Sequence, residues 1–89
     1  MGNPLSLEFM VACEIYGSQP IGINDLLTTM HTKTGKSRGE VTHAIHVANN
    51  FAILKMDASE NGIVFTTPAE AVPLIEPLYE KYWKQWLKI

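Results

Sequence analysis

The sequence has 89 residues, of which 46% are hydrophobic, and its formal net charge at pH 7 is −2. This length predicts one domain over residues 1–89, and the hydrophobic fraction excludes a disordered chain. No apolar run approaches the roughly 18 residues of a membrane span, and no secretory signal pattern opens the chain. Cys13 is the single cysteine, which excludes an internal disulfide, favours a cytoplasmic location and is expected to be an inert core thiol.

The charge is unevenly distributed along the chain. Residues 31–55 carry four basic side chains against the single acid Glu40, a net charge of +3, whereas the remainder carries −5. All three histidines also lie in this segment, and its basic residues are Lys33, Lys36, Arg38 and Lys55. An acidic chain with one basic segment can still present a phosphate-facing surface.

Apolar residues at helical spacing predict a first helix, which begins after Ser6 and ends at Gly17 in a left-handed conformation. Because apolar side chains cover much of its circumference, we expect this helix to lie inside the fold. Residues 18–21 are expected to be extended. A second helix is expected from Gly22, and it ends in the polar loop 31–36.

The third helix, from about Ser37 to Asn50, has the clearest start. Ser37 and Glu40 have the spacing of a capping box, in which each side chain bonds the backbone N–H of the other residue. The stripe expected to face inward is Val41, Ala44, Ile45 and Ala48. The side chains expected to face outward are Arg38, Gly39, Thr42, His43, His46, Asn49 and Asn50.

Two strands are predicted at residues 52–56 and 63–67, joined by a turn at Asn61-Gly62. The connecting residues carry the acids Asp57 and Glu60 and no base.

A final helix is predicted over about residues 68–87. The capping-box pair Thr67 and Glu70 opens it, and Pro73 and Pro77 are expected to kink or restart it. Its second half carries two aromatic-rich stripes, one of Leu78, Tyr82 and Trp86 and one of Tyr79, Trp83 and Leu87.

The order of three helices, a two-stranded hairpin and a helix resembles the winged helix-turn-helix superfamily. The matching segments are Pro20-Ile21-Gly22-Ile23-Asn24-Asp25-Leu26, Thr34 through Ile45, Phe51-Ala52-Ile53-Leu54-Lys55, and Phe65 through Leu78. The last is similar to the exit of MarR- and PadR-type regulators, whose terminal helices dimerise. The resemblance implies a mainly α fold with a small β-hairpin (α+β): a three-helix core over about residues 6–67, a two-stranded wing, and a C-terminal helix.

The sequence departs from this pattern at two places. Ala52 stands where a glycine is usual, so Asn49 or Asn50 is expected to adopt the positive φ that ends the third helix. The wing tip is acidic, and it is expected to be a poor phosphate contact.

The resemblance implies duplex DNA binding, with the third helix in the major groove. Arg38 is expected to pair with guanine, and Thr42 with a thymine methyl or a phosphate. Lys33, Lys36 and the N–H groups at Ser37 are expected to hold phosphates. Other polar contacts to bases are expected from His43, His46, Asn49 and Asn50. The alternative is a protein-interaction adaptor that docks through its acidic face or its aromatic helix.

Aromatic residues on two faces of one short helix predict a homodimer, because aromatic side chains are enriched at interfaces. The expected contacts are Leu78, Tyr79, Tyr82, Trp83 and Trp86. The alternative is that this helix folds back and caps the core of the first helix.

Other chemistries have weak support. Thr34-Gly35-Lys36-Ser37 lacks the earlier glycine of a phosphate-binding loop, since position 30 is Met30. His43 and His46 have metal spacing, but no further ligand completes a set. We therefore expect no enzyme, cofactor, metal or small-molecule substrate. We expect instead a compact DNA-binding regulator of phage, plasmid or prokaryotic type.

Overall fold

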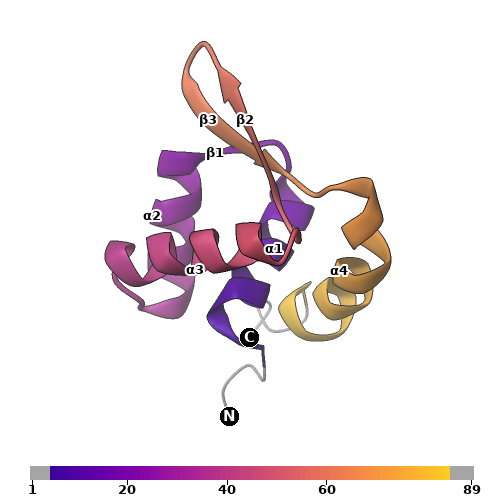
Figure 1. Cartoon of the computed structure of the whole chain (residues 1–89). Helices are drawn as coiled ribbons and strands as arrows, with labels where there is room; N and C mark the ends of the chain where they lie inside the picture. Colours follow the sequence, from indigo (N-terminus) through magenta and orange to yellow (C-terminus); the bar gives the residue numbers. More distant parts are fainter. Residues whose placement is uncertain (1–4, 85–89) are drawn as a thin grey trace.

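The computed structural model describes residues 5–84 (Figure 1). Its elements are α1 (Leu7–Ser18), β1 (Ile21–Gly22), α2 (Ile23–Thr34), α3 (Arg38–Asn50), β2 (Lys55–Ser59), β3 (Gly62–Thr66), the 3₁₀ turn η1 (Ala69–Ala71), α4 (Val72–Leu78) and the π-helical turn η2 (Tyr79–Trp83). The predicted class, mainly helical with a small antiparallel β element, is confirmed. No helix in this part of the chain is long and apolar enough to cross a membrane.

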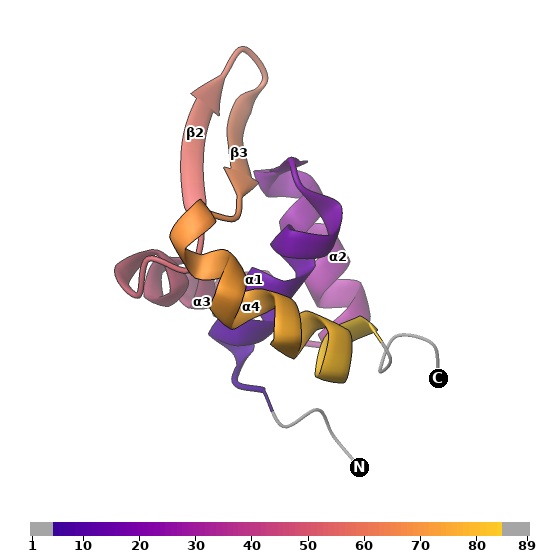
Figure 2. The same cartoon turned by 90° about the vertical axis from the view of Figure 1, so that its right-hand side faces the viewer.

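Helix α1 lies at the centre of the fold. It packs against α2 and α3 and, through its other faces, against α4 and η2. Figure 2 shows α4 crossing over α1, while the β2–β3 hairpin projects away from the helices. Five consecutive residues of α1, Val11 to Ile15, are buried, which confirms that this helix is internal. The C-terminal segment completes the same core with Ala71, Ile75 and Trp83.

The sheet has three antiparallel strands in the order β1-β3-β2. Phe65 is fully buried and pairs with Ile21 on one side and Met56 on the other. The hairpin was predicted, but its strands lie at 55–59 and 62–66, so the first strand starts later than expected. The reason is that Ile53 and Leu54 are used as buried core residues before strand pairing begins.

Helix α3 ends at Asn50, and the residue with positive φ that follows it is Ala52, not an asparagine. Ala52 has φ 57°, and it is the non-glycine residue with positive φ in the described part of the chain. Its N–H donates to the Asn49 carbonyl, and the Ile53 N–H donates to the Ala48 carbonyl. These bonds form a Schellman motif, so the expectation that Asn49 or Asn50 would adopt the positive φ is wrong. The residue in the usual glycine position adopts the glycine conformation despite its Cβ.

Substitution of Ala52 by glycine should therefore stabilise the protein by about 0.5–1 kcal/mol, because it removes the left-handed strain of a Cβ. Urea unfolding followed by circular dichroism measures this change. Ala58→Gly, in exposed strand β2, is the matched control and should be neutral or destabilising. A loss of stability in Ala52→Gly would contradict the strain.

The expectation that Gly17 ends α1 in a left-handed conformation is wrong. The helix continues to Ser18, and the role of Gly17 is to leave room for Tyr79. A Cβ at position 17 would lie 2.6 Å from Tyr79 Cε1. The glycine therefore serves a close tertiary approach.

The second predicted capping box is also absent. Pro68 is the N-cap of η1, and Thr67 Oγ1 is buried without a hydrogen-bond partner among the described residues. The Thr67 N–H instead donates to Gln19 Oε1 at 2.9 Å, which directs Thr67 toward the α1–β1 connection. The helix does not restart at Pro77: α4 passes through this proline and then widens into the π-helical turn η2.

Cys13 is fully buried, as predicted, and burial next to Glu14 raises the pKa of its thiol to about 12. At about pH 8 the reactive thiolate is then about one part in ten thousand. Iodoacetamide should label native Cys13 at a rate limited by unfolding, and label it rapidly in urea, as followed by mass spectrometry. Rapid labelling without denaturant would contradict this burial.

Candidate nucleic-acid interface

The start of α3 is fixed by the predicted capping box. The Glu40 N–H donates to Ser37 Oγ at 3.1 Å, and the Ser37 N–H donates to Glu40 Oε1 at 3.2 Å. The bonds from Ser37, with the charge of Lys36, hold the pKa of Glu40 below its usual value. Glu40 is thus an ionised side chain turned back onto its own helix start.

The turn before α3 is also closely tied. Gly35 adopts φ 75°, and its N–H donates to the His31 carbonyl. His31 Nδ1 lies 2.7 Å from the Lys36 carbonyl oxygen. The Lys36 N–H donates to Thr34 Oγ1, which in turn donates to the Met30 carbonyl. The position of Lys36 relative to α3 is therefore set by α2.

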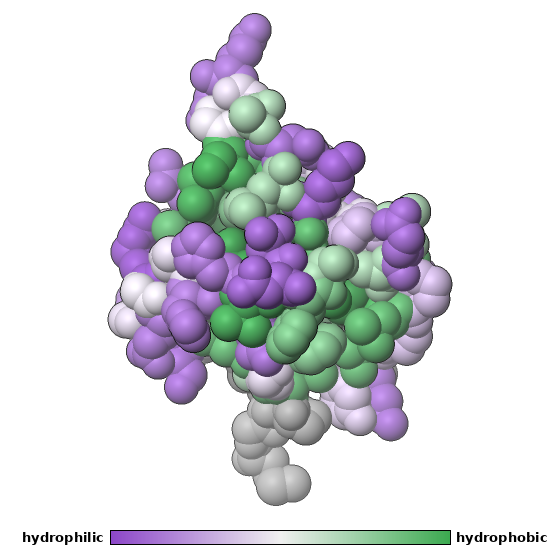
Figure 3. All heavy atoms as spheres, viewed as in Figure 1, coloured by the Kyte–Doolittle hydropathy of each residue, from purple (hydrophilic) through white to green (hydrophobic). Residues whose placement is uncertain are grey.

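The outward face of α3 has the composition that the sequence predicted. Val41, Ala44, Ile45 and Ala48 are buried. The exposed residues are Ser37, Arg38, Gly39, His43, His46, Asn49 and Asn50. Thr42 is half-buried, and its hydroxyl donates to the Arg38 carbonyl at 2.8 Å. Figure 3 shows that the surface around α3 is largely hydrophilic, with apolar patches beside it.

Lys33, which was predicted to hold a phosphate, is engaged in an ion pair with α1 and is not among the proposed phosphate contacts. Its Nζ lies 2.7 Å from Glu14 Oε1, in an ion pair whose carboxylate is almost fully buried. The same oxygen accepts a hydrogen bond from Trp83 Nε1 at 3.0 Å, and Lys33 Nζ lies 5.9 Å from the Trp83 ring centroid. Lys33 therefore compensates a buried charge.

Glu14 was missed by the sequence reasoning. It lies in the middle of the buried run Val11–Ile15, and this position was the available signal: an acid inside an apolar helix needs a buried partner. Its other oxygen accepts a hydrogen bond from Ser18 at 2.7 Å.

The charge that remains around α3 is smaller than the sequence suggested. Without Lys33, the exposed charges of residues 31–55 are those of three bases, Lys36, Arg38 and Lys55, and of one acid, Glu40. Lys55 begins β2, so it adds a cation at the base of the hairpin. The hairpin beyond it carries the exposed acids Asp57 and Glu60. Any phosphate contact should therefore come from α3, its preceding turn and the hairpin base.

The aromatic C-terminal segment packs on its own chain. Trp83 is fully buried, so the prediction that it lies at a dimer interface is wrong, and the alternative, a cap on α1, describes it. Tyr79 is half-buried, with its ring centroid 5.4 Å from that of Tyr16. Leu78 and Tyr82 are half-buried as well. Trp86 lies outside the described residues.

The histidines do not form a metal centre. Within residues 5–84 no three side chains of the His, Cys, Asp or Glu types converge on a point that a metal could occupy.

Comparisons with protein-family models, with curated proteins and with solved structures found no match.

Proposed function

We propose that this protein binds duplex DNA as a winged helix-turn-helix regulator in the cytoplasm, with α3 in the major groove and the β2–β3 hairpin as its wing. One observation carries the proposal: α3 is a capped helix whose outward face is exposed, apart from the half-buried Thr42, and is lined by Arg38, imidazoles and amides. A major groove about 12 Å wide admits one such helix, and residues of its N-terminal half reach base edges.

The residues divide into two roles. Arg38 is suited to a guanine, and Thr42, His43 and His46 follow it along the outward side of α3. Asn49 and Asn50 are suited to adenine. Lys36, the N–H groups at Ser37 and Lys55 are suited to phosphates. The acids Asp57 and Glu60 at the wing tip repel phosphates, so the rest of the hairpin stays away from the DNA backbone.

The salt dependence of binding tests the proposal quantitatively. The two lysines suited to phosphates, Lys36 and Lys55, predict a slope of log affinity against log salt of about −1.8 per protomer. Affinity for a labelled random duplex should fall about 12-fold between roughly 50 and 200 mM salt, as measured by fluorescence anisotropy. A bound homodimer, the second part of the proposal, would double the slope, and sedimentation measures its mass independently.

Variants locate the contact. Lys36→Ala should weaken binding and reduce the slope by about 0.9, because one phosphate contact is lost. Lys84→Ala is the matched control, since this exposed lysine lies in the C-terminal segment beside Glu80 and should leave the slope unchanged. Absence of binding at low salt, or equal effects of the two variants, would overturn the proposal.

A protein-interaction adaptor is the second candidate, and the hairpin favours it. Met56 and Ile63 are 37% and 40% exposed, beside the acids Asp57 and Glu60. Apolar side chains flanked by acids suit a protein partner better than DNA. Association with a protein partner through this surface should hardly respond to salt. Ile63→Ser should abolish the association, whereas Arg38→Ala should leave it unchanged.

A further inference from the structure

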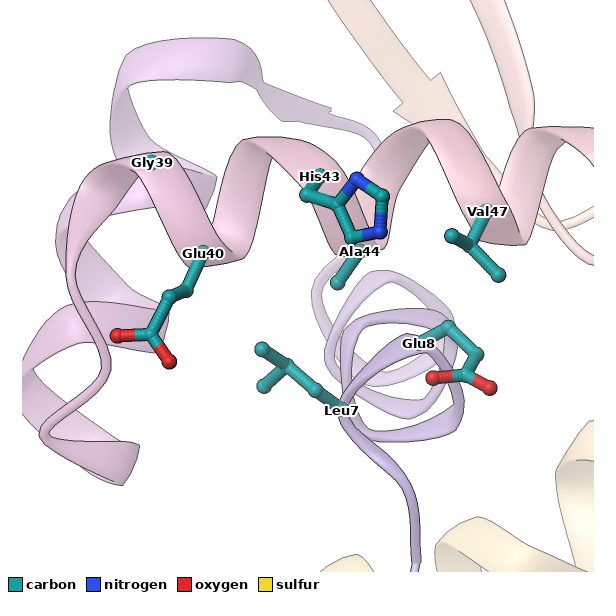
Figure 4. A pocket seen from close by; sticks show the side chains of 7 residues that line it. All are labelled: Leu7, Glu8, Gly39, Glu40, His43, Ala44 and Val47. Atoms are coloured by element: carbon teal, nitrogen blue, oxygen red, sulfur yellow. The ribbon is translucent and has the colours of Figure 1, made fainter.

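A groove of about 520 Å³ lies between the N-terminal turn of α1 and the side of α3. Leu7, Ala44 and Val47 form its apolar part, and Gly39 leaves it open at the start of α3. Figure 4 shows the carboxylates of Glu40 and Glu8 at opposite ends of this apolar surface, with Leu7 between them and the ring of His43 above Ala44. The volume lies in the range of small-ligand sites.

The two carboxylates are available to a ligand. Glu40 uses Oε1 for the capping box, and among residues 5–84 its Oε2 accepts no hydrogen bond. Glu8 is half-buried, and neither of its oxygens accepts a hydrogen bond within the same residues. No lysine or arginine lines the groove, and Lys36, which acts on Glu40, is not among the lining residues.

This arrangement selects the charge of the occupant. Two carboxylates repel phosphate, so the groove is not a phosphate site, although His43 borders both the groove and the DNA surface of α3. They lie at opposite ends of an apolar surface with no third acid beside them, which does not suit a bare metal ion. The complementary ligand has a positive charge and an apolar body.

We propose that the α1–α3 groove is a binding site for a small organic cation with an apolar body, such as a substituted ammonium compound. The ammonium group is attracted by Glu8 and Glu40, and the apolar body covers Leu7, Ala44 and Val47. This site goes beyond the proposed DNA contact and requires no DNA for its detection.

Three probes separate charge from apolar contact: benzyltrimethylammonium, tetramethylammonium and benzyl alcohol. Each is titrated into the full chain at low salt and followed by amide NMR shifts. The first should shift Leu7, Glu8, Gly39, Ala44 and Val47 with a Kd of about 1–10 mM, as expected for a ligand of this size. The other two should bind several-fold more weakly, because each lacks one half of the recognition.

Glu8→Gln and Glu40→Gln test the carboxylates, and glutamine at position 40 preserves the capping box. Each should weaken benzyltrimethylammonium binding about two- to five-fold and leave benzyl alcohol unaffected. Glu60→Gln, at the hairpin turn, is the control for the loss of one negative charge. It should change the binding of neither benzyltrimethylammonium nor benzyl alcohol.

Several results would overturn the site. These are equal binding of benzyl alcohol and the cation, equal effects of Glu8→Gln and Glu60→Gln, or shifts spread over all acidic surfaces. Groove shifts that depend on protein concentration without any probe would assign the groove to a second copy instead. None of these results would bear on the DNA titration, so the two proposals fail separately.

Discussion

Glu14→Ala should destabilise the protein by about 2–4 kcal/mol, because it leaves the buried Trp83 N–H without an acceptor, removes the ion pair of Lys33 and opens a cavity beside them. Glu14 is 4% exposed, and loss of its carboxylate deprives Lys33, Trp83 and Ser18 of their acceptor. A domain of this size has a total stability of about 4–13 kcal/mol, so the variant should lose a large part of it. Urea unfolding followed by far-UV circular dichroism measures the loss, and thermal unfolding should shift down by about 15 °C.

Glu76→Ala is the control. Like Glu14, Glu76 accepts a side-chain hydrogen bond, in its case from the Tyr16 hydroxyl, but it lies at the surface. Its loss should be below about 1 kcal/mol. The double variant Glu14→Leu and Lys33→Met removes both charges, and should be more stable than Glu14→Ala alone. A loss in Glu14→Ala no larger than in Glu76→Ala would refute the buried network.

Gly17→Ala should destabilise the protein by about 1–3 kcal/mol, opposite to the usual gain when alanine replaces glycine in a helix. The new Cβ would lie 2.6–2.9 Å from two ring carbons and the hydroxyl oxygen of Tyr79. The ring must then leave its edge contact with Tyr16 and uncover α1. The midpoint and slope of urea unfolding give the change in the free energy of unfolding.

Gly39→Ala is the matched control in α3. The nearest atom to its added Cβ is Ser37 Oγ at 3.9 Å, so this variant should be stabilised by about 0.5–1 kcal/mol. In a Tyr79→Ala background, Gly17→Ala should lose its destabilising effect, because the obstructing ring is gone. Equal responses of Gly17 and Gly39 would show that Tyr79 does not constrain position 17.

Local patterns predicted most of the fold. The capping box of Ser37 and Glu40 and the inward stripe of α3 each depend on residues a few positions apart, and the structure contains both. The hairpin turn lies one residue earlier than predicted, at Glu60-Asn61, and Gly62 begins β3 with φ 112°. The predicted start of the first strand was wrong, because the local alternation of apolar and polar residues cannot show that Ile53 and Leu54 are core residues that precede strand pairing. The predicted capping box at Thr67 was wrong, because the Thr67 N–H donates to Gln19, which lies 48 positions away in sequence.

The candidate site shows the same limit. The outward face of α3 could be read from its period, since exposure on a helix follows from spacing. Lys33 could not be separated from Lys36 in this way, because its partner Glu14 lies on another helix. Trp83 was assigned to an interface for the same reason: only the packing of η2 on α1 shows that its indole N–H has a partner inside the chain.

The hydrogen bond between Glu14 and Trp83 joins residues 69 positions apart, and this constrains when the chain can fold during its synthesis. A nascent chain that has emerged only as far as β3 holds α1, α2 and α3 but lacks Ile75 and Trp83, which fill the remaining face of α1. Its Glu14 carboxylate would also lack the indole donor. Such an intermediate exposes apolar surface, and native packing must wait until the C-terminal segment leaves the ribosome. Translation of the last segment is thus a step on the folding pathway.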